Sequence, residues 1–127
     1  MSRIYEDDFI YIEKENSQIP WVKIFTQKDF KELSHCDEFT LDRLFKASMI
    51  VEKTMLSFYK PDKINHASFA NYVPKVHIHV MARFKNDNFF PESVWGKKQR
   101  DTNLNLPSFD KFTEILKKNL EILFTYT

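Results

Sequence analysis

The sequence predicts an α+β domain with a mainly antiparallel sheet of about five strands, one long helix and a C-terminal helix. Short segments of strand composition lie on both sides of a long segment whose apolar residues recur every three or four positions. A second segment with this helical spacing lies near the C-terminus. Gly96 is the only glycine, which argues against an all-β barrel, because tight turns between strands need positive φ. The length of 127 residues favours a single domain over residues 1–127.

Each element is predicted from its own local pattern. The helix predicted over residues 38–59 can be capped at its start by Asp37 or Thr40, and Pro61 prevents its continuation. The segment over residues 85–107 has no clear period and is predicted to be a loop, and a loop of that length in a small domain is usually functional or mobile. In chain order we predict strands 9–14 and 21–25, helix 38–59, strands 63–70 and 75–84, loop 85–107 and helix 108–124.

Composition excludes several classes of function. The net charge of +1 gives no overall attraction to nucleic acid or to an anionic membrane surface. The single Cys36 excludes an intramolecular disulfide and a zinc site built on cysteine pairs. The N-terminus is acidic, unlike a signal peptide, and no uncharged apolar run approaches the ~18 residues of a membrane span. We therefore expect a cytoplasmic protein with no DNA, RNA or membrane partner.

The strand predicted over residues 75–84 has two chemically different faces. Side chains alternate between the faces of a strand, so one face here is apolar and the other carries cations and imidazoles. The apolar face has Val76, Ile78, Val80 and Ala82, and the polar face has Lys75, His77, His79, Met81 and Arg83. Neighbours on one face lie ~7 Å apart, a spacing that suits either a bound phosphate or two ligands of one metal ion.

The residues alone leave three interpretations of this polar face open. It can be a solvated face without chemistry. It can be a metal site in which His66, His35 or a carboxylate joins His77 and His79 as third ligand, although Lys75 and Arg83 would repel a cation. It can also support nucleophilic catalysis at phosphorus, because neutral imidazole is a good nucleophile near pH 7 and forms a phosphoramidate that water can hydrolyse.

The stretch NYVPKVHIHVMARF, residues 71–84, resembles the signature of the histidine-triad (HIT) superfamily, in which three histidines alternate with apolar residues. Ala70-Asn71 lies where the family commonly has Gly-Asn or Gly-Gln. His77 and His79 match the second and third histidines, and Arg83 follows. The segment FFPESVWG, residues 89–96, is similar to the segment after the triad in short bacterial members. The resemblance is clearest over residues 63–96 and implies a HIT-like fold.

The resemblance implies catalytic roles for the two histidines. His77 matches the nucleophile that attacks the α-phosphorus, and His79 matches the histidine that contacts a phosphate oxygen. Lys75 replaces the first histidine of the triad. A lysine can donate but cannot accept a proton at neutral pH, so whether this replacement preserves catalysis is the main question that the motif raises.

Substrate-binding roles are expected at Asn71, Asn65, Lys75, Arg83 and Trp95. Asn71 matches an amide that approaches the α-phosphate, and Asn65 falls near a second family amide with an offset of one residue. Lys75 and Arg83 could add positive charge near the phosphates, and Trp95 could close over a base or anchor its loop. The acidic residue that usually holds the ribose has no clear match, although Glu13 and Glu15 are nearby.

The resemblance implies a nucleotide hydrolase or transferase that acts through a covalent nucleotidyl-histidine. Its substrate would be a nucleoside phosphoramidate, an acyl or aminoacyl adenylate or a dinucleoside polyphosphate. No resident metal or cofactor is expected, although Mg²⁺ can accompany a polyphosphate. Family members generally form a homodimer through the main helix and a sheet edge. The alternatives are a nucleotide-binding protein with weak or lost activity and a metal-binding protein that uses His77 and His79.

Overall fold

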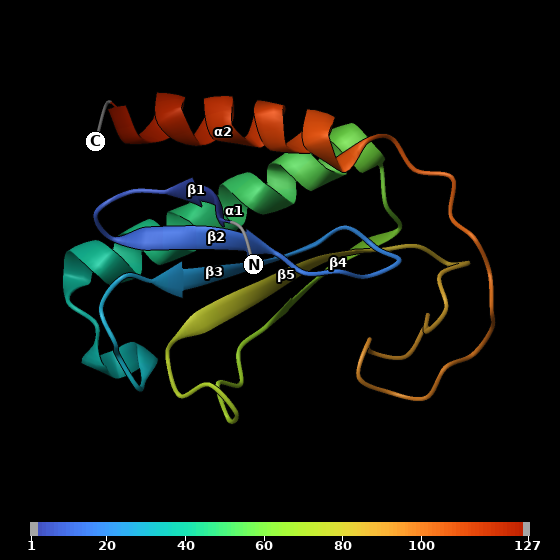
Figure 1. The fold of residues 1–127 in the computed structure, drawn as a ribbon, viewed down its shortest axis with the longest axis horizontal. Helices are drawn as coiled ribbons and strands as arrows, with labels where there is room; N and C mark the ends of the chain where they lie inside the picture. The colour runs from blue at the N-terminus through green and yellow to red at the C-terminus, as the bar shows by residue number, and fades with distance from the viewer. Residues whose placement is uncertain (1–2, 126–127) are drawn as a thin grey trace.

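The computed structural model describes residues 3–125, which form one five-stranded sheet and two α-helices (Figure 1). In chain order the elements are β1 (Arg3–Glu6), β2 (Ile10–Lys14), β3 (Trp21–Thr26), the 3-10 turn η1 (Leu33–His35), α1 (Glu38–Tyr59), β4 (Lys63–Ala67), β5 (His77–Arg83) and α2 (Phe109–Thr125). The strand order is β1-β2-β3-β5-β4, and every neighbouring pair is antiparallel. The predicted α+β fold with an antiparallel sheet is confirmed.

Helix α1 begins and ends where its sequence signals predict. At its start the two carboxylate oxygens of Asp37 accept hydrogen bonds from the amide and the hydroxyl of Thr40, at 2.8 and 2.9 Å. After Tyr59, Lys60 adopts a left-handed conformation with φ of 51°, and Pro61 cannot continue a helix. The predicted range 38–59 is therefore confirmed at both ends.

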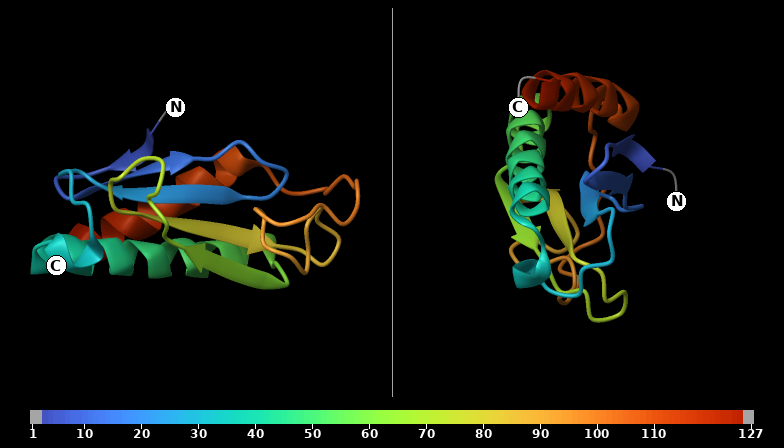
Figure 2. Two further views of the ribbon diagram at one scale, coloured as in Figure 1. Left: turned by 90° about the horizontal axis from the view of Figure 1, so that it is seen from below. Right: turned by 90° about the vertical axis from the view of Figure 1, so that its left-hand side faces the viewer.

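Both helices pack on the same apolar side of the molecule. Helix α1 lies over β2, β3 and β5, and α2 lies against α1 and β1 (Figure 2). The core between the helices and the sheet includes Ile10, Ile12, Val22, Ile24, Leu44, Val51, Met55, Ile78, Val80, Phe112, Leu116 and Leu120. Within residues 3–125, neither helix has the length and apolar character needed to cross a membrane. The opposite face of the sheet has no helix over it in this part of the chain.

Strand register decides which side chains share that helix-free face. Phe25 of β3 is directly opposite His77 of β5, and Lys23 is directly opposite His79. On the other side of β5, Ala67 of β4 is also paired with His79. Side chains at paired positions of antiparallel strands point to the same face. The two histidines, Lys23 and Phe25 therefore lie together, with the apolar face of β5 turned toward the helices.

The predicted strand ends differ from the observed ones on both sides of one loop. The strand predicted over 63–70 ends at Ala67, and the strand predicted over 75–84 begins only at His77. Between them the hydroxyl of Ser68 donates to the carbonyl of His77 at 2.8 Å, so a side chain replaces the next main-chain bond of the ladder. Strand β1 was not predicted, because four residues with exposed charged ends give almost no alternating pattern.

Candidate functional site

A pocket of about 410 Å³ lies on the helix-free face of the sheet. Strands β3 and β5, the loop over residues 69–73 and the long loop after β5 all contribute to it. Its lining is rich in aromatic rings and contains both histidines: Glu15, Lys23, Phe25, Phe69, Ala70, Asn71, Tyr72, Val73, His77, His79 and Trp95. A pocket of this size can hold a small organic ligand.

The His77 ring is fixed by one hydrogen bond and one ring contact. Its Nδ1 lies 2.7 Å from the carbonyl oxygen of Lys75. A carbonyl oxygen only accepts, so Nδ1 donates and Nε2 of the neutral ring carries a lone pair. The ring also stacks on Phe25, with centroids 4.6 Å apart and planes inclined by 27°. This arrangement leaves Nε2 as the nucleophilic nitrogen in the pocket.

The Nδ1 atom of His79 accepts a hydrogen bond, whereas that of His77 donates one. The indole Nε1–H of Trp21 donates to Nδ1 of His79 at 3.0 Å. Because an indole can only donate, Nδ1 is unprotonated and the proton of the neutral ring is on Nε2. Burial, His77 and Lys23, in that order, lower the pKa of His79 to about 4. His79 is therefore a neutral N–H donor near pH 7.

The two imidazoles meet edge to face, with ring centroids 5.0 Å apart and planes inclined by 70°. One ring presents a lone pair and its neighbour an N–H group. A lone pair can attack an electrophilic atom, while an adjacent N–H can bind an oxygen on that atom. The geometry therefore suits substitution at a centre that carries electron-rich oxygens.

We expect the His79 ring to remain neutral, with its proton on Nε2, until the pH approaches 4. Long-range ¹⁵N–¹H spectra recorded between pH 8 and pH 4 measure both the tautomer and the titration. The pKa of His79 is lower in the folded protein than its unfolded value of about 6.5, so protonation of this ring favours the unfolded state. The free energy of unfolding should therefore decline as the pH falls from about 6.5 toward 4. The full loss is about 3 kcal/mol before any allowance for solvent screening, and less with it.

Trp21→Phe removes the indole donor and should move the His79 titration toward neutral pH. Trp95→Phe is the control, because Trp95 contacts the same ring only edge to face, at 5.1 Å between centroids. A proton on Nδ1 of His79 at neutral pH in the wild-type chain would contradict the assignment.

Comparison with known proteins identifies the family. The HIT domain model matches residues 2–86, two thirds of the chain. The chain belongs to the HIT domain family. A comparison with curated proteins gave no match.

Solved structures share the HIT fold. A histidine triad protein from Bradyrhizobium japonicum is 23% identical with a TM-score of 0.73, covering 95% of this chain and 88% of that chain. One from Marinobacter aquaeolei VT8 is 24% identical with a TM-score of 0.71, covering 96% and 87%. One from Sinorhizobium meliloti 1021 is 22% identical with a TM-score of 0.71, covering 94% and 87%. At these identities the similarity establishes the fold.

Four of the residues nominated from the sequence line the pocket of the HIT domain: His77, His79, Asn71 and Trp95. Trp95 reaches it from the long loop and meets His79 and Phe69 edge to face, each at 5.1 Å between centroids. Asn71 follows Ala70, which has a left-handed φ of 54°. That conformation favours glycine and gives a physical reason for the glycine common at this position in the family.

Lys75 contributes to the site through its main chain and not through its ammonium group. Its carbonyl orients His77, but its Nζ lies 3.2 Å from the hydroxyl of Tyr11, 3.4 Å from the carbonyl of Gln27 and 3.4 Å from Asp29 Oδ1. The side chain does not line the pocket. The expected positive charge beside the phosphates is therefore not supplied by Lys75 in this arrangement.

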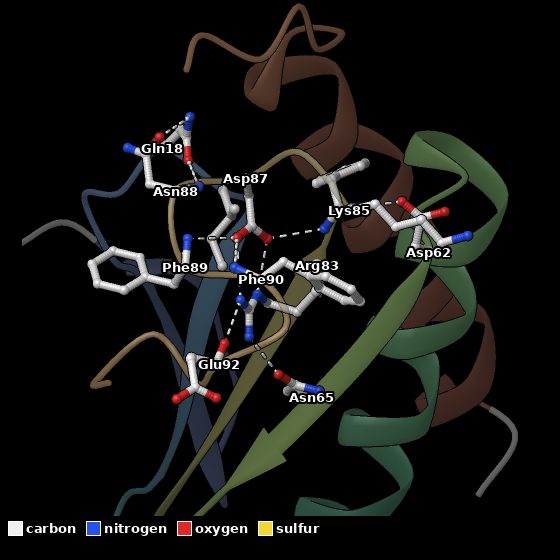
Figure 3. Close-up of polar contacts among 12 residues, drawn as sticks. Gln18, Asp62, Asn65, Arg83, Lys85, Asp87, Asn88, Phe89, Phe90 and Glu92 are labelled. Atoms are coloured by element: carbon white, nitrogen blue, oxygen red, sulfur yellow. Dashed lines mark hydrogen bonds and ion pairs between the residues drawn. The ribbon is translucent and has the colours of Figure 1, made fainter. Parts of the chain in front are cut away.

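Arg83 and Asn65 lie outside the pocket, at the base of the long loop (Figure 3). The Arg83 guanidinium forms a two-point ion pair with Asp87, at 3.0 and 3.1 Å. It also donates to Asn65 Oδ1 at 2.8 Å and to the carbonyl of Glu92 at 2.7 Å. A phosphate-binding role for Arg83 does not fit this arrangement, because its side chain is only 2% exposed and is bonded to these three residues.

The pocket residues that were not nominated from the sequence include Lys23, Phe25 and Phe69. Alternation along residues 21–25 places Lys23 and Phe25 on one face, but the sequence does not say which strand lies beside them. Only the register with β5 brings them to the histidines. Glu15, noted above as unmatched, also lines the pocket, whereas Glu13 does not.

The metal-site interpretation lacks a third ligand in the described part of the chain. Among residues 3–125, no group of three or more His, Cys, Asp or Glu side chains is placed to hold a metal ion. His66, one of the candidate third ligands, bonds instead to Glu52 of α1 at 2.8 Å.

Proposed function

We propose that this HIT domain is a nucleotide hydrolase or transferase that acts at the α-phosphate of a nucleoside phosphate derivative. The observation that carries the proposal is the pair of complementary imidazoles, with a lone pair on Nε2 of His77 beside an N–H on Nε2 of His79. The protein is proposed to work in the cytoplasm without a resident cofactor, with Mg²⁺ arriving only on a polyphosphate substrate.

In the first step Nε2 of His77 attacks the α-phosphorus, and a P–N bond forms as the bond to the leaving group breaks. The leaving group departs with the bonding electron pair, and the Nδ1 proton stays hydrogen-bonded to the carbonyl of Lys75. His79 donates its Nε2–H to a non-bridging oxygen, where negative charge accumulates. The product is a nucleotidyl-histidine.

In the second step water attacks the same phosphorus and the P–N bond breaks. His77 recovers its lone pair, the water oxygen stays on the nucleoside monophosphate, and one proton goes to solvent. A transferase would use an alcohol or phosphate in place of water. Asn71, which is exposed on the pocket rim, is proposed to bind the α-phosphate, and Trp95 to contact the base or the leaving group.

The test is release of AMP from adenosine 5′-phosphoramidate and from diadenosine tetraphosphate, with mass spectrometry of the protein after a rapid quench in base, which preserves a P–N bond. We expect AMP from at least one substrate and a nucleotidyl group on the peptide that contains His77. Nucleotide binding without AMP or adduct would instead support the binding-protein alternative.

Lys75→His, run in parallel, should change kcat by less than about tenfold, because Lys75 contacts His77 only through its main-chain carbonyl.

A homodimer is part of the proposal. Helix α1 exposes Phe45, Met49 and Leu56 at 43–45% of their surface, on the side of the helix that is not packed on the core. Association through these side chains would remove apolar area from water.

A further inference from the structure

A phosphate bound in this pocket needs a positive charge close to it. Phosphate esters are anionic at neutral pH, and burying an anion is costly unless a cation pairs with it. The two cations expected from the sequence are engaged elsewhere, Lys75 with Tyr11 and Arg83 with Asp87. Among the described residues that line the pocket, Lys23 is the only lysine or arginine.

Sheet register places Lys23 beside the catalytic pair. It is directly opposite His79, and the Cβ atoms of such antiparallel partners are ~5 Å apart. Phe25, its neighbour on the same face, is opposite His77. The Lys23 side chain is 13% exposed, so water screens its charge only in part. Its charge is also among those that lower the pKa of His79.

Within the pocket, Lys23 is paired with a carboxylate, that of Glu15. Its Oε1 lies 3.0 Å from Nζ of Lys23, and Glu15 itself lines the pocket. The Glu15 amide donates to the carbonyl of Trp21 at 2.9 Å, which holds its main chain to the β2–β3 hairpin. The Glu15 carboxylate would repel a phosphate. When a phosphate binds, the ion pair between Lys23 and Glu15 must therefore break, and Lys23 pairs with the phosphate instead.

We propose that Lys23 binds a phosphate of the leaving group, so that this site prefers nucleoside polyphosphates over phosphoramidates. The inference rests on the proposed function, in which His77 and His79 engage the α-phosphate. Lys23 lies on the same face of β3 as Phe25, two residues earlier in the chain, and the ring of Phe25 stacks on that of His77. Its ammonium can therefore reach the phosphate next to the one under attack.

The chemistry of the two leaving groups gives the selectivity. When the bond between the α-phosphorus and the bridging oxygen breaks, the electron pair stays on that oxygen and the polyphosphate gains a negative charge. Lys23 stabilises that charge, and no proton is required. A phosphoramidate loses an amine, which takes up a proton from solvent as it departs and gains no negative charge, so Lys23 gives it no comparable help.

The experiment compares Lys23→Met with the wild-type chain on diadenosine tetraphosphate and adenosine 5′-phosphoramidate. We expect kcat/KM for the tetraphosphate to fall about 10- to 100-fold, the loss typical of a hydrogen bond between charged groups. The value for the phosphoramidate should change less than about threefold, and Lys23→Arg should restore much of the tetraphosphate activity. Glu15→Gln should raise kcat/KM for the tetraphosphate, because the competing carboxylate is gone.

Lys46→Met is the matched control, because Lys46 forms an ion pair of the same 3.0 Å length with Asp42 on the exposed surface of α1. Equal losses on both substrates, or no loss on the tetraphosphate, would overturn the role of Lys23. If the wild-type chain releases AMP from neither substrate, the proposed function fails, and calorimetry decides the role of Lys23 separately. In that case, the role of Lys23 is supported if Lys23→Met binds the tetraphosphate more weakly than the wild type and binds AMP equally well. The role is contradicted if the substitution leaves tetraphosphate binding unchanged, or if the wild-type chain does not bind the tetraphosphate.

Discussion

Replacing His77 with alanine is expected to lower kcat for nucleotide release by about 10⁴-fold or more, the size of loss seen when a nucleophile is removed. The Nε2 lone pair, which the hydrogen bond to the Lys75 carbonyl preserves, has no substitute in the described pocket, because His79 carries its proton on Nε2 and accepts from Trp21 on Nδ1. The measurement is AMP release under single-turnover conditions, with circular dichroism to confirm that the variant folds.

His66→Ala is the control, because His66 bonds to Glu52 outside the pocket and should leave kcat unchanged. A sharper form uses His77→Gly with the phosphorimidazolide of AMP as substrate. That compound already contains the P–N bond that His77 would form, so the variant should hydrolyse it while remaining inactive on the ordinary substrates. Activity of His77→Ala within tenfold of the wild type would show that His77 is not the nucleophile.

Breaking the Arg83–Asp87 pair should cause a large loss of stability. Both side chains are 2% exposed, and Asp87→Asn would leave the guanidinium buried without its counter-charge. Removing one partner of a buried pair costs about 3–5 kcal/mol, which lowers Tm by about 10–20 °C in a domain of this size. Urea and thermal unfolding measure the change.

The comparison pair is Lys98–Asp101, an exposed ion pair at 3.3 Å whose loss through Asp101→Asn should stay within about 0.5 kcal/mol. The double variant Arg83→Met with Asp87→Leu should lose less than the sum of the single losses, because no charge is then left unpaired. A loss below about 1 kcal/mol for Asp87→Asn would mean that the pair is dispensable to the fold.

Acid should weaken the same pair. Burial alone would raise the pKa of Asp87, but hydrogen bonds from Arg83 and from the amides of Phe84, Phe89 and Phe90 lower it to about 2. A carboxyl group with a lowered folded-state pKa contributes stability above its unfolded value, and that contribution is lost as the pH falls toward the folded value. The Asp87 contribution is therefore lost between about pH 4 and pH 2, below the range in which His79 titrates.

Local patterns predicted the parts of the fold that local chemistry determines. Helix α1 was predicted at both ends, because its cap and its terminating proline lie within three residues of those ends. Strand β1 was missed, because its place at the sheet edge depends on pairing with β2 and not on its own composition. The loop between β4 and β5 was assigned in part to both strands, since nothing local shows where the ladder stops.

The candidate site was predictable only along one strand. Alternation and the resemblance found His77 and His79, but alternation gives the face of a side chain and not its partner. Arg83 was therefore placed with the phosphate, although a carboxylate four residues later in the chain binds it. Lys23 was missed because it lies beside the histidines only through the pairing of β3 with β5, and these strands are far apart in the sequence.

The carboxylate of Asp87 joins the end of β5 to the long loop that carries Trp95. A loop of this length without helix or strand would ordinarily open on its own, at a small fraction of the global unfolding free energy. Here one carboxylate accepts the amides of Phe84, Phe89 and Phe90, and Arg83, which it binds, also holds the carbonyl of Glu92. The part of the loop that borders the pocket and the strand that bears the histidines should thus form one cooperative unit. Those amides should exchange their hydrogens with solvent only when the sheet itself unfolds.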